Sequence, residues 1–229
     1  MSGRLFITFE GTDGSGKSTQ IRLLEKALIS GGFDPVVTRE PGGTRIGELI
    51  RSIILDTGNT EISDVAEMML YAASRAQHVD EVIRPNLEAG RIVISDRFVD
   101  SSIAYQGGAR GLGNAVQEVN AYAVRDCVPD LTFFLLSDPV KLFERIERKD
   151  ADRIEAEGLE VQRAARAAYE KIAAEDRGRV VVIDASRPAN EIHAEIAALV
   201  GANLKKQGGA NERGDERGGA GNAEGAAHE

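Results

Sequence analysis

Short apolar runs alternate with amphipathic segments along most of this chain. Five runs have the length and the β-branched or aromatic residues of buried strands: residues 5–9, 35–38, 91–95, 131–136 and 179–183. Segments with apolar residues at helical spacing separate these runs. Such an alternation predicts a five-stranded parallel sheet with helices on both faces, which is a three-layer α/β/α fold.

The ends of two further segments can also be predicted. Ser63 or Asp64 is placed to cap a long helix over residues 65–87, and Pro85 would lie near its end or kink it. From about residue 205 the chain is rich in Gly, Ala, Asn and charged residues without apolar periodicity. We therefore expect one domain over residues 1–204 and a disordered low-complexity tail over residues 205–229.

Composition narrows the class of protein. The chain has 229 residues, 28 basic and 37 acidic, with a formal charge of −9. Nucleic-acid binders usually carry a basic face, so this balance argues against one. Cys127 is the only cysteine, and it is expected to be a small packed residue. No apolar run approaches the ~18 residues of a membrane span, and no signal peptide is apparent, so a cytoplasmic protein without a membrane partner is expected.

The chemistry begins at residues 11–19, Gly-Thr-Asp-Gly-Ser-Gly-Lys-Ser-Thr, which fit the phosphate-loop pattern G-x-x-x-x-G-K-[ST]. An apolar strand precedes them and a helical pattern follows. Glycines let backbone N–H groups approach phosphate oxygens, and the dipole of the following helix favours negative charge. We therefore expect a nucleotide phosphate to be bound by Gly11, Thr12, Asp13, Gly14, Ser15, Gly16, Lys17 and Ser18.

A second motif is the strand over residues 91–95, which ends in Asp96-Arg97-Phe98. An apolar strand that ends in Asp is the usual place for a carboxylate that positions Mg²⁺, and the Ser18 hydroxyl can ligate the same ion. Lys17 can reach the β- and γ-phosphates. Arg97 would suit an acceptor phosphate, although an Asp–Arg pair that caps the next helix fits the same residues.

Four weaker signals lie elsewhere. They are the Gly-rich run 38–44 (Thr-Arg-Glu-Pro-Gly-Gly-Thr), Tyr71 and Arg75 on one helical face, the run 100–108 and the basic segment 145–153. A ring and an Arg on one face can stack on a base and bind its edge, and a basic segment can cover a phosphoryl-transfer site. Each signal by itself also fits an ordinary loop, a core tyrosine or a solvated charged surface.

Taken together, these motifs closely resemble the thymidylate kinase family, nucleoside-monophosphate kinases that make dTDP from dTMP. The matching runs are 9–11, 39–44, Tyr71 with Arg75, 96–98, 104–107 and 152–155, and the resemblance covers about residues 5–204. Phe98 departs mildly from the family's usual Tyr or His. Gly14 stands where one subgroup has an arginine, which points to the bacterial type with catalytic arginines in a lid. The resemblance implies a P-loop NTPase-like fold, a helical lid at about residues 145–157 and a homodimer.

The resemblance also implies a reaction and a set of roles. The γ-phosphoryl group of ATP would pass to the 5′-phosphate of dTMP with Mg²⁺ held by Ser18 and Asp96. Lys17 would hold the moving group, Arg97 the acceptor phosphate, and Arg153 and Arg148 would be the lid cations. Tyr71 would stack on thymine, Arg75 would bind its edge, Ser102 would stand near the base, Tyr105 would crowd the sugar 2′ position, and Asp13 would face the 3′-hydroxyl.

Two other functions are compatible with a phosphate loop. A deoxynucleoside kinase has a neutral hydroxyl as acceptor and would need a general base such as Glu40. A nucleotide switch or binding module would hydrolyse slowly, but the sequence has no Asn-Lys-x-Asp guanine signature. An acceptor phosphate is already mostly dianionic at neutral pH, because its second pKa is about 6, so a monophosphate kinase needs no base.

Overall fold

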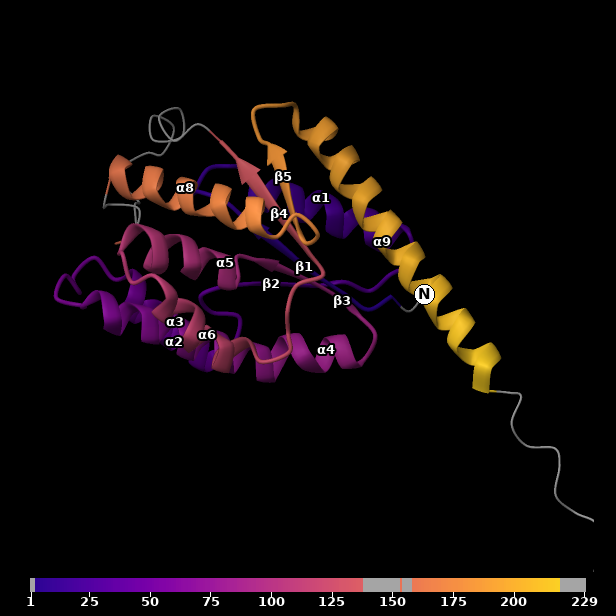
Figure 1. Cartoon of the computed structure of the whole chain (residues 1–229), viewed down its shortest axis with the longest axis horizontal. Coiled ribbons are helices and arrows are strands. Elements are labelled where there is room, and N and C mark those ends of the chain that lie inside the picture. The colour runs from indigo at the N-terminus through magenta and orange to yellow at the C-terminus, as the bar shows by residue number, and fades with distance from the viewer. Residues whose placement is uncertain (1–2, 138–152, 154–157, 219–229) are drawn as a thin grey trace, which may run out of the picture.

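The computed structural model describes residues 3–137, 153 and 158–218. Its centre is a parallel sheet with strand order β2-β3-β1-β4-β5. Helices lie on both faces of this sheet (Figure 1). The predicted three-layer α/β/α fold is confirmed, and each predicted strand is present within one residue of its expected ends. The strands are β1 Leu5–Glu10, β2 Val36–Arg39, β3 Ile92–Asp96, β4 Leu131–Leu136 and β5 Val180–Asp184.

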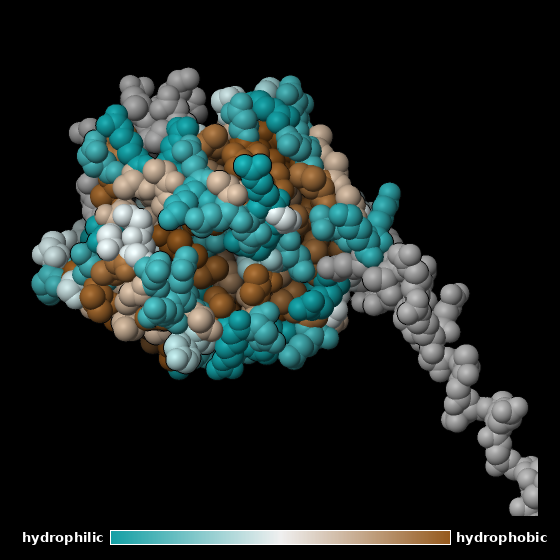
Figure 2. All heavy atoms as spheres, viewed as in Figure 1, coloured by the Kyte–Doolittle hydropathy of each residue, from teal (hydrophilic) through white to brown (hydrophobic). Residues whose placement is uncertain are grey.

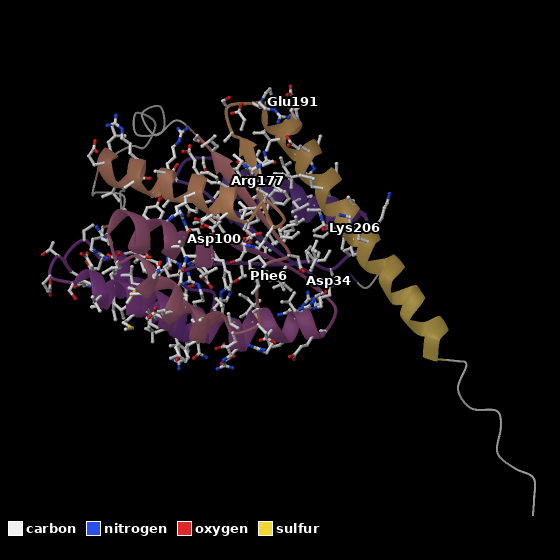
Figure 3. All side chains as sticks on the ribbon, in the orientation of Figure 1. Phe6, Asp34, Asp100, Arg177, Glu191 and Lys206 are labelled. Carbon is white, nitrogen blue, oxygen red and sulfur yellow. The ribbon has the colours of Figure 1, made fainter. Side chains whose placement is uncertain are left out.

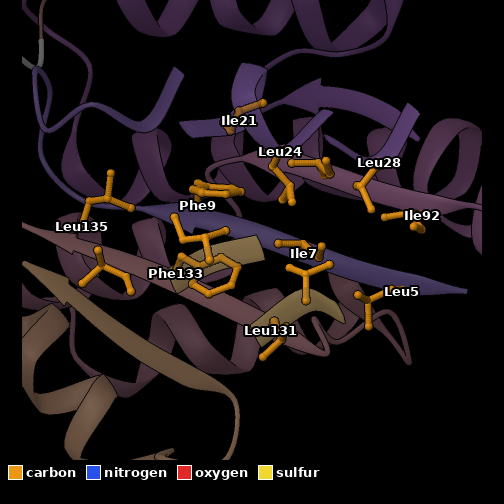
Figure 4. Packing of buried hydrophobic residues seen from close by; sticks show 14 of the residues in the cluster. Leu5, Ile7, Phe9, Ile21, Leu24, Leu28, Ile92, Leu131, Phe133 and Leu135 are labelled. Atoms are coloured by element: carbon orange, nitrogen blue, oxygen red, sulfur yellow. The ribbon is translucent and has the colours of Figure 1, made fainter. Parts of the chain in front are cut away.

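Alternation along β1 separates the two faces of the sheet. Leu5, Ile7 and Phe9 pack with residues of α1 (Lys17–Ser30) and α9 (Ala189–Gly218), as Figure 4 shows for α1. Phe6 instead packs on the opposite face, against residues of η1 (Val79–Ile83) and α4 (Arg84–Glu88). Because successive side chains of a strand point to opposite faces, Thr8 and Glu10 belong to the Phe6 face.

The remaining helices cover the second face and one end of the sheet. A second cluster on the Phe6 face joins η2 and α8 to β4 and β5. On the face seen in Figure 2, hydrophilic and hydrophobic side chains are interspersed. None of the described helices is both long and apolar enough to cross a membrane. The bounds are α2 Arg45–Leu55, α3 Asp64–His78, α5 Val99–Ser102, η2 Ile103–Ala109, α6 Asn114–Val124 and α8 Leu159–Glu175.

The predicted long helix 65–87 is a continuous helical run with a change of winding. Ser63 is its N-cap, since its side chain accepts a hydrogen bond from the backbone N–H of Ala66 at 3.3 Å. The run passes from α3 through the π-helical turn η1 into α4, where Pro85 occupies the first turn. Proline is tolerated there because the change from π-helical to α-helical winding directly before α4 interrupts the regular ladder of hydrogen bonds.

The C-terminal region differs from the sequence prediction. A disordered tail was expected from residue 205, whereas α9 continues to Gly218 (Figure 1). The first part of α9 packs Ile192, Ile196 and Val200 into the core. A helix with such an anchored start can extend, because each added residue gains one backbone hydrogen bond without a new nucleation step. Residues 219–229 of the predicted tail lie outside the described residues.

The parallel register brings the functional loops together. Asp96 pairs with Phe9 of β1 and with Arg39 of β2, so β1, β2 and β3 end at the same edge. Ligands of open α/β sheets bind outside the carboxyl ends of the strands. The phosphate loop, the turn after Asp96 and the loop after Arg39 all leave from this edge.

Candidate active site

The phosphate loop has the backbone shape that its glycines allow. Gly11 has a φ of 134°, and a Cβ atom there would lie 2.8 Å from the carbonyl oxygen of Leu135. Gly16 has a φ of 95° and is the N-cap of α1. A side chain is strained in these conformations, so the glycines are required for the loop to fold over the start of α1.

Lys17 is held inside this loop. Its side chain is buried, and Nζ donates to the carbonyl oxygens of Gly11 and Thr12, both at 3.1 Å. Burial lowers the pKa of Lys17 to about 8, and the positive charge of Arg97 adds to this effect while Asp13 opposes it. An ammonium group that is poorly solvated gains strongly from an anion, and a nucleotide phosphate would supply one.

Ser18 and Asp96 come together as the sequence predicted. The Ser18 hydroxyl donates to Oδ2 of Asp96 at 3.3 Å. Oδ1 of Asp96 is buried and has no hydrogen-bond partner among the described residues. A hydroxyl and a carboxylate oxygen are the hard donors that Mg²⁺ prefers, and the unpartnered oxygen leaves coordination capacity open. The two residues therefore fit a magnesium site. The described residues contain no group of three or more His, Cys, Asp or Glu arranged around one metal position.

Arg97 and Asp13 form a half-buried ion pair. The guanidinium donates to Oδ1 of Asp13 at 2.8 Å and lies 5.5 Å from the ring centroid of Tyr105. Burial opposes ionisation of Asp13, but the charges of Arg97 and Lys17 outweigh it and lower its pKa to about 2. The pKa of Arg97 is raised well above its usual value, because Asp13 and its other negative neighbours outweigh the effect of burial. Both groups are therefore charged at neutral pH.

Two cavities meet at this ion pair. The first, of about 360 Å³, lies over the phosphate loop, where Lys17, Ser18 and Asp96 line it. The second, of about 150 Å³, lies between α3 and the turn after β3. Asp13 and Arg97 line both. All six residues predicted for the acceptor line the second cavity: Asp13, Tyr71, Arg75, Arg97, Ser102 and Tyr105.

The remaining residues of the phosphate loop contribute in different ways. Gly14 and Gly16 line the first cavity. Thr12 and Ser15 are buried, and Gly11 is enclosed against the backbone of β4. These residues shape the loop that presents its backbone N–H groups.

Arg75 is held on the wall of the second cavity by four partners. Nε donates to Oε2 of Glu40 at 2.8 Å. The other nitrogens donate to Ser102 Oγ and the Phe98 carbonyl oxygen, each at 3.0 Å, and to the side chain of Asn120. The arginine is only 1% exposed. Tyr71 lies one helical turn earlier on α3, as the spacing predicts.

Glu40 is the centre of this arrangement. One carboxylate oxygen binds Arg75, and the other contacts Nδ1 of His78 at 2.9 Å. Nε2 of His78 in turn contacts Thr38 Oγ1 at 2.6 Å. A carboxylate tied to two side chains in this way is a positioning group. A deoxynucleoside kinase would instead require Glu40 to act as a general base.

Sequence reasoning missed two residues of the site. Arg51 lines both cavities and donates to the Pro41 carbonyl oxygen at 3.0 Å. Gln106 lines the second cavity and donates to Glu67 at 2.8 Å. Arg51 is one basic residue on an amphipathic helix, so no local signal marks it. Gln106 lies in the run 104–107, which resembles the family, and this resemblance could have marked Gln106 as a site residue.

The structure does not bring Arg153 to either cavity. Its guanidinium donates to the Ile54 carbonyl oxygen at 2.8 Å and to Oε2 of Glu67 at 2.5 Å. Glu67 is buried and also receives hydrogen bonds from Arg110 and Gln106. Arg148 and the rest of the predicted lid lie outside the described residues.

Comparisons with known proteins agree on one family. A family model described as Thymidylate kinase matches residues 9–196. The chain is 51% identical to a thymidylate kinase of Halothermothrix orenii over 84% of this chain and 94% of that protein. It is 47% identical to one of a Geobacillus species over 87% and 97%. A crystal structure of thymidylate kinase from Ehrlichia chaffeensis has a TM-score of 0.71 at 33% identity, and the match covers 86% of this chain and 98% of that one.

Proposed function

This chain belongs to the thymidylate kinase family, and from that premise we propose how its residues divide the phosphorylation of dTMP. The protein is a nucleotide-binding transferase, a kinase of nucleotide biosynthesis. We propose ATP as the donor bound in the cavity over the phosphate loop and dTMP as the acceptor bound in the second cavity. The observation that carries this assignment is that the two cavities meet at Asp13 and Arg97.

The meeting point suits a transfer between two phosphates. The Arg97 guanidinium lines both cavities, so it can bind the acceptor phosphate beside the donor phosphates. Because that phosphate is already mostly dianionic at neutral pH, the protein needs to supply alignment and positive charge rather than a base. Lys17 starts from the loop carbonyls and would move its ammonium to the transferring phosphoryl group. Arg51, which lines both cavities, is a further cation for these phosphates.

Ser18 and Asp96 would hold Mg²⁺. When bound, the ion would neutralise charge on the β- and γ-phosphates. The remaining ligands would come from the nucleotide and water, because Mg²⁺ usually keeps several non-protein ligands.

The second cavity would select the acceptor. Tyr71 would stack on thymine, and Arg75 with Ser102 would face the edge of the base. Tyr105 would stand against the sugar 2′ position and Asp13 on the side of its 3′-hydroxyl. All these residues line the cavity, and the Arg75 network holds the guanidinium in one place. A fixed polar wall discriminates well, because a base without matching groups would leave buried donors unpaired.

One assay tests the proposed reaction against its alternatives. The enzyme is incubated with Mg-ATP and either dTMP or thymidine, and the products are separated. Formation of dTDP from dTMP supports the proposal. Formation of dTMP from thymidine would indicate a deoxynucleoside kinase, and release of phosphate without nucleotide transfer would indicate a switch or an ATPase.

Arg75→Ala should raise the KM for dTMP far more than the KM for ATP. The substitution removes a guanidinium from the wall of the acceptor cavity and none from the donor cavity. It also leaves Glu40 buried without its arginine, so a lower melting temperature is expected as well. Steady-state kinetics with each substrate varied in turn measure the two KM values. Equal increases in both would mean that Arg75 supports the fold and does not recognise the base.

We further propose that Arg153 and Arg148 act as lid cations for the transferred charge. In the present conformation Arg153 pairs with Glu67, so it would have to leave this partner to reach the phosphates. Arg153→Ala should therefore lower kcat strongly with small effects on either KM, because its contact would form mainly in the transition state. Arg148→Ala should act similarly, and the two losses should be non-additive.

Arg110→Ala is the matched control for this prediction. Arg110 contacts the same Glu67 carboxylate at 3.1 Å, but it lies outside the predicted lid. Loss of kcat in Arg153→Ala and not in Arg110→Ala supports a lid role. Equal losses would show that both arginines act only through Glu67, and wild-type kcat in Arg153→Ala would remove it from the mechanism.

We also propose that the enzyme is a cytoplasmic homodimer. Helix α3 packs against both α2 and α6. Five large apolar side chains are exposed on these three helices: Leu49, Ile53, Val65, Met69 and Tyr122. A second copy of the chain would cover this surface, and the sedimentation coefficient of the protein tests it. Cys127 is the single cysteine, so the chain has no intrachain disulfide, as is usual for cytoplasmic proteins.

A further inference from the structure

The backbone at Arg97 has a conformation that needs support. Its φ is 71°, in the left-handed region that residues with side chains rarely adopt. Three hydrogen bonds hold the turn around it. Arg97 N–H donates to the Phe9 carbonyl oxygen at 2.9 Å, Ser95 Oγ donates to the Arg97 carbonyl oxygen at 2.7 Å, and Phe98 N–H donates to Oε1 of Glu10 at 2.7 Å. One of the three partners is thus a buried carboxylate at the end of β1.

The second oxygen of Glu10 binds the side chains that surround the Arg97 guanidinium. Oε2 accepts from Ser101 Oγ at 2.5 Å and from the Tyr169 hydroxyl at 2.9 Å. The same two hydroxyls lie 3.1 and 3.4 Å from Nη1 of Arg97. Glu10 therefore contacts both the backbone that follows Arg97 and the groups that hold its guanidinium.

We propose that Glu10 is a positioning residue for the phosphoryl transfer, which fixes the Arg97 guanidinium where the acceptor phosphate binds. The inference deepens the proposed function, because it rests on the role of Arg97 given above. Glu10 is fully buried and is not among the residues that line either cavity. It acts through the turn and through Ser101 and Tyr169.

The electrostatics of Glu10 argue against a role in stability alone. Burial raises the pKa of Glu10 to about 7, and the charge of Asp100 adds to the rise, while Ser101, Arg97 and Tyr169 lower it. Asp100, labelled in Figure 3, is paired with Arg179 at 2.6 Å, so it is not the partner of Glu10. A carboxyl group in such a place costs more than an apolar side chain of the same size. Its three directed hydrogen bonds are what an apolar residue could not provide.

Glu10→Gln tests the proposal with little change in shape. The amide retains one acceptor oxygen and replaces the other by an NH₂ donor, so it cannot accept from Phe98 N–H and from both hydroxyls. The turn would relax and the guanidinium would shift. A misplacement of about 1 Å can cost about 10²-fold in rate. We expect kcat/KM for dTMP to fall about 10- to 100-fold, while the KM for ATP stays within about twofold of wild type.

Thr8→Val is the matched control. Thr8 lies on the same face of β1, is fully buried and shares a hydrogen bond of 2.7 Å with Thr132. Its loss removes a buried hydrogen bond on the same strand without touching the Arg97 turn. We expect a lower melting temperature with unchanged values of both KM. If Glu10→Gln behaves like Thr8→Val, the role of Glu10 is structural and the proposal is overturned.

Two further variants separate the possible failures. Arg97→Ala, measured in parallel, should raise the KM for dTMP; if it does not, the acceptor assignment fails together with the proposal. If Arg97→Ala does and Glu10→Gln does not, only the positioning role fails. Should Glu10→Gln not fold, Tyr169→Phe carries the test, since it removes one hydrogen bond to the carboxylate and keeps Glu10. A several-fold rise in the KM for dTMP supports the proposal, and an unchanged KM overturns it.

Discussion

Replacing Lys17 with methionine is expected to lower kcat by about 10²- to 10³-fold in an enzyme that remains folded. Methionine retains an unbranched stem of similar length in the buried position and removes the ammonium. The Lys17 Nζ contacts only two loop carbonyls and Asp13 among the described residues, at 3.1, 3.1 and 3.8 Å. The Lys17→Met variant would therefore lose mainly the positive charge that faces the transferring phosphoryl group. Steady-state kcat with saturating Mg-ATP and dTMP is the measurement.

Lys26→Met is the matched control for this substitution. Lys26 is also on α1, but its side chain is exposed and away from the loop. It should have wild-type kcat, and both variants should keep nearly the wild-type melting temperature. Near-normal turnover in a folded Lys17→Met protein would contradict the assignment of the donor site.

Replacing Arg97 with alanine is expected to lower kcat/KM for dTMP by about 10²- to 10³-fold. The guanidinium lies where the two cavities meet, and no other described arginine occupies the turn after Asp96. The substitution also removes the principal cation from Asp13, whose pKa is about 2 because of that charge. Arg97→Lys should recover part of the loss, because lysine restores the positive charge but cannot form the bidentate hydrogen bonds of a guanidinium.

Arg91→Ala controls for the removal of an arginine from the same strand region. Arg91 precedes β3 at the opposite end and pairs with Asp34 at 2.7 Å, far along the strand from the cavities. It should leave both KM values unchanged. If Arg97→Ala keeps a wild-type KM for dTMP, Arg97 does not bind the acceptor phosphate, and the second cavity must be reassigned.

Much of the fold could be predicted from the sequence because its signals are local. The apolar runs marked all five strands, and Ser63 marked the start of α3. The phosphate loop was predictable for the same reason. Its strand, glycines and helix are contiguous, and the loop shape depends on residues such as Gly11 and Gly16 that need positive φ.

The site was predicted less completely, and the resemblance to a family supplied most of what was found. Tyr71 and Arg75 share a helical face that spacing alone predicts, yet their cavity forms only where α3 meets the turn after β3. The lid assignment of Arg153 came from a motif, and the structure places this residue on Glu67. The end of α9 also departed from expectation, because an anchored helix extends beyond its apolar residues.

The sequence by itself determined the strands and the phosphate loop, and it marked Ser18 in the first turn of α1 and Asp96 at the end of β3 as candidate metal ligands. Only the tertiary structure decided which distant groups hold each charged side chain. Glu10 accepts a hydrogen bond from Tyr169, which lies 159 positions further along the chain. Arg75 of α3 contacts Glu40, which follows β2, and Asn120 of α6. Local propensity acts over a few residues, whereas a buried charge must find its partners wherever the packed elements bring them. The positions of Arg97 and Arg75 are therefore properties of the whole fold.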